Sequence, residues 1–250
     1  MFSTRVSLKW ANEQASEPTS TYVITSPGAH FVDIRILASA YPYNPTKGDA
    51  TYEEVFDWVS SGMEQVVEGA DETGETVEIK FKLEIDSMEV TEAIKTGKPI
   101  EDCRRGTDSG IFSEIPGSED RKEIGNMVNP AIGQNQDYIE IWRSLDPEKH
   151  TPTTEVREDA TAKGISSYVL VCDSEHWEGK VVRLGNWVQG LIHSKQSHEL
   201  HVVRAWFNGS EWEYLIRFGD VELFDLDFSG TKGNVTEKKG LKWECIEYSS

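Results

Sequence analysis

Alternating hydrophobicity predicts an all-β protein whose strands are mainly antiparallel. Residues 180–220 read as consecutive β runs, and the Asn208-Gly209-Ser210 break between the last two runs is typical of a hairpin. In the last run every second residue from Trp212 to Phe218 is large and apolar, so the strand buries one face. Residues 145–164 combine two prolines with many charges and few apolar side chains, which indicates a linker. The sequence therefore predicts two small β-barrels, over residues 1–146 and 147–250.

The first half contains several short alternating segments. Strands are predicted over residues 3–10, 22–25, 31–37, 77–85 and 138–143. Residues 113–131 read as a long polar loop.

One segment of the first half has two interpretations. Thr51 and Glu54 satisfy a capping box, and Val55, Trp58 and Val59 follow with helical spacing, which predicts one or two helical turns. A strand over residues 56–62 is the alternative.

The second half begins with a β run over residues 167–172 and continues through the 180–220 meander. Two further runs, residues 221–228 and 241–248, are expected to complete the second barrel.

Composition and charge exclude several classes of protein. The chain has 44 Asp and Glu against 25 Lys and Arg, a formal net charge of −19, which disfavours binding to nucleic acid or to an anionic membrane. No run approaches the ~18 apolar residues of a membrane span. Cys103, Cys172 and Cys245 are few, odd in number and far apart, so we expect reduced thiols and an intracellular protein.

The usual catalytic and cofactor motifs are missing. The sequence has no GxGxxG, P-loop, GxSxG or HExxH. His193, His198 and His201 cluster, but their spacing does not match a metal site. We therefore expect neither a metal nor a cofactor.

The best candidate for a pocket lies in the first barrel, on the strand over residues 31–37. Asp33 and Arg35 share one phase there, so they form either a solvent-exposed ion pair or a polar group inside the barrel. In the second case the guanidinium can polarise a carbonyl and Asp33 can orient it or move a proton. Trp58, Met63 and Trp142 would supply an apolar wall, and Asp108 a further polar contact.

A second candidate set lies in the second barrel. It consists of Gln189, His193, Arg204 and Trp206, in which aromatic and polar side chains share strands. Core packing is the alternative reading of the same residues.

Several stretches, taken together, resemble a fungal family whose best-known member was named for its interaction with a casein-kinase-1-type protein kinase. They are STYVITSPGAHFVDIRI, the DSG at residues 108–110, VNPAIG followed by YIEIWRSLDP, VVRLGNWVQGLI and GLKWECIEY. The resemblance implies two lipocalin-like (calycin-like) β-barrels packed together. It also implies a cytoplasmic location, with the nucleus as an additional one, and a protein kinase as partner.

Three functions follow from this reading. The first is a cofactor-free enzyme of fungal secondary metabolism that binds a hydrophobic, oxygenated substrate and promotes dehydration and cyclisation, by analogy with lipocalin-like Diels–Alder-type cyclases. The second is a non-catalytic protein that binds a kinase. The third is a carrier of small molecules.

Overall fold

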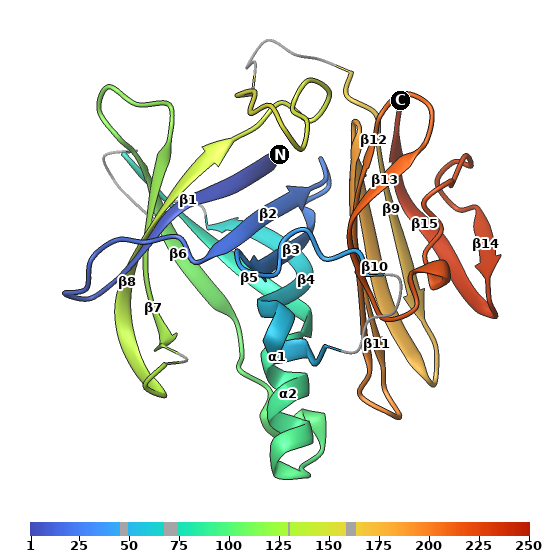
Figure 1. Ribbon diagram of the computed structural model, residues 1–250, viewed down its shortest axis with the longest axis horizontal. Coiled ribbons are helices and arrows are strands. Elements are labelled where there is room, and N and C mark those ends of the chain that lie inside the picture. The colour runs from blue at the N-terminus through green and yellow to red at the C-terminus, as the bar shows by residue number, and fades with distance from the viewer. Residues whose placement is uncertain (46–49, 68–74, 130, 159–163) are drawn as a thin grey trace.

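The computed structural model describes residues 1–45, 50–67, 75–129, 131–158 and 164–250. The described residues form a closed eight-stranded barrel and a separate seven-stranded sheet, which lie side by side (Figure 1). All strand pairs within these two units are antiparallel, so the predicted all-β antiparallel class is confirmed. The second predicted barrel is not confirmed, because the second half is an open sheet among these residues.

The barrel strands follow each other in chain order, and β1 pairs with β8 to close the ring. They are β1 (Phe2–Trp10), β2 (Thr19–Thr25), β3 (His30–Leu37), β4 (Phe56–Val67), β5 (Thr76–Asp86), β6 (Asp108–Glu114), β7 (Arg121–Asn129) and β8 (Gln134–Ser144). The second sheet has the order β13-β12-β11-β10-β9-β15-β14. Its strands are β9 (Ser167–Asp173), β10 (Trp177–Leu184), β11 (Trp187–Ser194), β12 (Leu200–Phe207), β13 (Trp212–Phe218), β14 (Val235–Lys238) and β15 (Leu241–Ser249).

Two short helices lie at one end of the barrel (Figure 1). α1 (Tyr52–Val55) leads directly into β4, so the segment with two interpretations contains both a helical turn and a strand. The Glu54 carboxylate accepts a hydrogen bond of 2.8 Å from the Thr51 backbone N–H, as a capping box requires. α2 (Ser87–Thr96) was not predicted, although Asp86 caps its first turn and Gly97 ends it in the left-handed region.

The expected polar loop over residues 113–131 is wrong, because β7 occupies its second half. This strand has Glu123 and Gly125 on the face that lines the barrel and Ile124 on the exposed face. A strand with a polar inner face and an apolar outer residue does not give the usual alternation signal, so the pattern was missed.

The segment over residues 221–228 is also not a strand. It forms the short 3₁₀ turn η2 (Val221–Leu223) and an irregular stretch that packs on one face of the second sheet. Phe224, Leu226 and Phe228 bury their side chains against that face, in the place where a second lumen was expected. The alternating apolar residues over 221–228 therefore predicted burial correctly, but the segment is not a strand.

The other face of the second sheet packs against the barrel. Val32, Ile34 and Ile36 of β3 share one apolar core with side chains such as Val182 and Leu191 of the second sheet. Both faces of the second sheet are thus covered by apolar side chains.

Two buried polar side chains connect the sheet to the barrel backbone. Gln189 Nε2 donates to the Val32 carbonyl at 2.8 Å and to the Tyr22 carbonyl at 3.0 Å. Arg204 Nη2 donates to the Ile34 carbonyl at 2.8 Å, and Arg204 Nε donates to Gln189 Oε1 at 2.7 Å. These bonds fix the position of β3 relative to the second sheet.

Cys103, Cys172 and Cys245 are buried free thiols. Over the ranges that the structure describes, no helix combines the length and the apolarity needed to cross a bilayer.

Arg204→Met is expected to lower the free energy of unfolding by about 3 kcal/mol, because the buried Ile34 carbonyl, the part-buried Ser20 carbonyl and Gln189 lose a charged donor. Urea unfolding followed by tryptophan fluorescence measures the loss. Arg217→Met, on the exposed side of β13, is the matched control and should cost less than about 1 kcal/mol. Equal losses in the two variants would contradict a connecting role for Arg204.

Candidate functional site

The lumen of the first barrel holds a network of buried charges built on β3. Strand alternation sends Phe31, Asp33 and Arg35 inward, whereas Val32 and Ile34 face the second sheet. Arg35 Nε donates to Asp33 Oδ2 at 2.9 Å, and Arg35 Nη1 donates to Glu140 Oε1 at 3.2 Å. The Arg35 side chain keeps only 10% of its accessible surface. Of the two interpretations of the Asp33–Arg35 pair, the structure has the interior one.

Glu140, on β8, bridges two arginines. Its Oε1 also accepts from Arg5 Nη1 of β1 at 2.5 Å. Arg5 in turn donates from Nε to Glu17 Oε2 at 2.7 Å, so each of its nitrogens has an acidic or hydroxyl partner. The two guanidinium groups are therefore paired with three carboxylates, of Glu17, Asp33 and Glu140.

One oxygen of this network has no partner. Asp33 Oδ1 is buried and accepts no hydrogen bond from any described residue. Burial raises the pKa of Asp33, and the neighbouring Arg35 opposes that rise. An unsatisfied acceptor in a closed site costs free energy unless a water or a ligand supplies a donor.

Aromatic rings surround the charged groups. The Arg35 guanidinium lies 4.5 Å from the ring centroid of Trp58 and 5.9 Å from that of Trp142, within the range of a cation–π contact. Phe81 makes edge-to-face contacts with Phe31 and Phe112 at centroid distances of 5.9 and 6.4 Å. The lumen thus presents apolar walls with a few fixed polar groups.

Glu123, on β7, is a second buried carboxyl group in the lumen. Its oxygens accept from Tyr138 Oη at 2.8 Å and from Trp142 Nε1 at 2.7 Å. Burial, together with the nearby Glu140, raises its pKa to about 8, so it is mostly a neutral acid at pH 7. Gly110 and Gly125 make this arrangement possible, because a Cβ at either position would collide with Glu123 or Tyr138.

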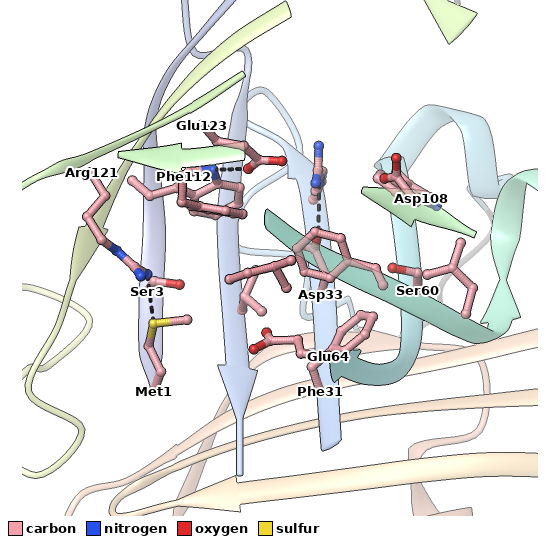
Figure 2. Close-up of a pocket in the computed structure, with 17 residues that line it drawn as sticks. Met1, Ser3, Phe31, Asp33, Ser60, Glu64, Asp108, Phe112, Arg121 and Glu123 are labelled. Carbon is pink, nitrogen blue, oxygen red and sulfur yellow. Dashed lines mark hydrogen bonds and ion pairs between the residues drawn. The ribbon is translucent and has the colours of Figure 1, made fainter. Parts of the chain in front are cut away.

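The polar and aromatic side chains enclose a cavity of about 50 Å³ (Figure 2). An outer cleft of about 390 Å³ shares Trp58, Leu83 and Asp108 with it and includes Arg105. Arg105 lies over the Trp58 ring at 5.8 Å and forms an ion pair with Asp86 at 3.5 Å. The inner cavity therefore adjoins a larger space at the end of the barrel where Trp58 lies.

Most of the residues proposed for the first barrel meet in this cavity. Asp33, Arg35, Trp58, Asp108 and Trp142 all line it. Met63 does not line it, because it has the opposite phase to Trp58 and Ser60 on β4.

The second set of proposed residues lies outside the lumen. Gln189 and Arg204 bind the barrel backbone at the interface between the two units. His193 Nδ1 is hydrogen-bonded to Glu178 Oε1 at 2.8 Å, and His193 Nε2 is hydrogen-bonded to His198 Nδ1 at 3.2 Å. The Trp206 indole N–H lacks a hydrogen-bond acceptor among the described residues. No group of three or more His, Cys, Asp or Glu suited to a metal ion occurs in the part of the chain that the structure describes.

Sequence reasoning missed Arg5, Ser60, Glu123, Tyr138 and Glu140. A signal for Glu140 was present, because it shares a phase with Tyr138 and Trp142 in YIEIWR. An acid between two aromatic residues on one strand face indicates a polar interior position. Glu123 gave no comparable signal, since its strand was read as a loop.

Comparisons with known proteins support this fold over the whole chain. The family model described as Protein HRI1 matches residues 1–247. A Protein HRI1 from Kluyveromyces lactis is 23% identical over 239 residues, covering 92% of this chain and 91% of its own. A Protein HRI1 from Saccharomyces cerevisiae strain S288c is 22% identical over 245 residues, covering 93% of each chain. The crystal structure of the S. cerevisiae protein YLR301w superposes with a TM-score of 0.77 at 20% identity, covering 100% of this chain and 98% of that one.

Glu123→Gln is expected to flatten the pH dependence of stability. The folded-state pKa of Glu123 is raised, so its contribution to stability is complete below its ordinary pKa of 4.5 and is lost as the pH rises through about 8. The variant should therefore gain stability relative to wild type between about pH 5 and pH 9. Urea unfolding at several pH values measures this, with Glu114→Gln, an exposed position on β6, as control. Parallel profiles for wild type and Glu123→Gln would contradict the assigned ionisation.

Proposed function

The chain belongs to the Protein HRI1 family, and from that premise we propose that its barrel binds a small organic molecule in the lumen. The observation that carries this proposal is the unpartnered Asp33 Oδ1 beside a cavity with aromatic walls. Ligand sites combine an apolar lining with a few convergent polar groups in this way. The lumen keeps several buried charges, each of which costs free energy that an apolar filling would avoid.

Cavity size favours a compact ligand group over a bulky one. The inner cavity of about 50 Å³ is well below the ~150 Å³ that holds a benzene ring. Ordinary ligand pockets measure roughly 300–1,000 Å³, which the outer cleft reaches and the inner cavity does not. A ligand therefore places a small polar head in the lumen and its larger body toward Trp58 and the outer cleft.

The size of the inner cavity favours ligand binding over catalysis as the function of the barrel. Cofactor-free dehydration and cyclisation of a hydrophobic, oxygenated substrate needs the reacting part of that substrate inside the lumen, and the cavity is small for it. Glu123, a neutral acid at pH 7, and Asp33 beside Arg35 are the groups that support acid–base chemistry as a second candidate. Kinase binding rests on the family resemblance alone and stays a prediction.

Ser60→Leu tests the proposed site by filling it. Ser60 faces Asp33 across β3 and β4 and lines the cavity, so a leucine there occupies the space of the ligand head. Benzyl alcohol and benzylamine serve as probes, and NMR of the indole N–H groups of Trp58 and Trp142 detects them. We expect saturable shifts in wild type and affinity weaker by about tenfold or more in Ser60→Leu, the equivalent of about 1.4 kcal/mol.

Ser109→Leu on the outward side of β6 is the matched control, and it should bind both probes like wild type. Absence of saturable shifts in wild type would contradict the proposed function. Equal binding by wild type and Ser60→Leu would contradict the lumen as the site.

A further inference from the structure

Most of the hydrogen-bond donors around Asp33 already have an acceptor, whereas one of its own oxygens has no donor. The indole N–H groups of Trp58 and Trp142 and the hydroxyl of Tyr138 already donate to carboxylates. Arg5 uses all of its nitrogens, and Arg35 uses Nε and Nη1. Arg35 Nη2 and the Ser60 hydroxyl near Asp33, and Arg121 Nε and Nη1 in the same lining, make no hydrogen bond to a described residue.

Two carboxylates in the lumen keep unused hydrogen-bond acceptors. Asp33 Oδ1 has no partner, and Asp108 accepts only from the backbone N–H of Ser109, at 2.9 Å. Asp33 and Ser60 are cross-strand partners, and Asp108 lines the same cavity from β6 (Figure 2). The buried Asp33 Oδ1 therefore favours a ligand group that donates a hydrogen bond.

The charged groups of the lumen also favour a cationic ligand. The acidic side chains that line the lumen are Asp33, Glu64, Asp108 and Glu123, and Glu140 adjoins them. The cations that line it are Arg35, Arg121 and the Met1 amino group, and Arg5 adjoins through its ion pairs with Glu140 and Glu17. Even with Glu123 neutral, five carboxylates, Glu17 included, face four cationic groups. Glu140 shows that one carboxylate in this lumen can serve two cations, because it binds both Arg5 and Arg35.

The walls suit a cation as well. Trp58 and Trp142 already face the Arg35 guanidinium, and the rings of Phe31, Phe81 and Phe112 surround the remaining space. Aromatic faces attract ammonium groups most strongly where water is excluded.

Resting on the proposed function, we infer that the ligand of the barrel is a primary amine on a small apolar or aromatic body. Its ammonium group binds Asp33 Oδ1, with Ser60 and Asp108 as further acceptors. Its body extends past Trp58 and Leu83 into the outer cleft.

Three probes of matched shape test the ligand class: benzylamine, benzyl alcohol and benzoate. Calorimetric titration of the full chain should give benzylamine an affinity about tenfold or more above that of benzyl alcohol, because its hydrogen bond to Asp33 joins two charged groups. Benzoate should bind more weakly than the alcohol. Asp33→Asn should weaken benzylamine about tenfold and leave benzyl alcohol within about threefold.

Asp137→Asn, on the outer surface of β8, is the control and should change neither affinity. Asp108→Asn is the second variant if Asp33→Asn does not fold, and it should weaken benzylamine selectively. If benzyl alcohol or benzoate binds as tightly as benzylamine, or if Asp33→Asn keeps its affinity for benzylamine, the amine class is wrong while binding in the barrel stands. If none of the three probes binds wild type, the proposed function is wrong as well.

Discussion

The candidate site depends on one strand, β3, that is buried on both faces. Its odd-numbered residues place Asp33 and Arg35 in the lumen, and its even-numbered residues, such as Ile34, pack against the second sheet. Gln189 and Arg204 hold the backbone of the same strand through the Val32 and Ile34 carbonyls. The second sheet, which is open over the residues that the structure describes, therefore acts as a rigid support for the charged face of β3. A site carried on a strand fixed in this way is more rigid than one carried on loops.

Keeping charges inside the barrel is costly, and the arrangement of partners shows how the cost is offset. Each buried ion costs several kcal/mol on transfer from water, so it persists only with well-placed partners. Arg5 is paired with Glu17 and Glu140, and Arg35 is paired with Asp33 and Glu140. Glu123 avoids the cost by remaining neutral at pH 7. Asp33 is the exception, because one of its oxygens has no partner among the described residues. An unsatisfied buried acceptor is unusual in a folded protein, and a ligand that donates a hydrogen bond to Asp33 would satisfy it.

Strand alternation predicted the inner part of this site and failed where its assumptions failed. The phase of Asp33 and Arg35 in FVDIRIL is enough to place them together, and the same rule excludes Met63, which is out of phase with Trp58. Glu123 escaped prediction because β7 presents a polar inner face. The second barrel was over-predicted because Phe224, Leu226 and Phe228 bury apolar side chains without forming a strand. The contact between Arg5 and Glu140 forms because β1 pairs with β8 to close the barrel. A local sequence pattern does not predict that pairing.

The most direct test is a high-resolution crystal structure of the full chain grown with benzylamine. We expect electron density for the amine in the lumen, with its nitrogen about 2.7–3.2 Å from Asp33 Oδ1 and its ring toward Trp58. A lumen in which an ordered water satisfies Asp33 Oδ1 and excludes the amine would contradict it, because the unpartnered oxygen would then belong to a hydrated scaffold and not to a binding site.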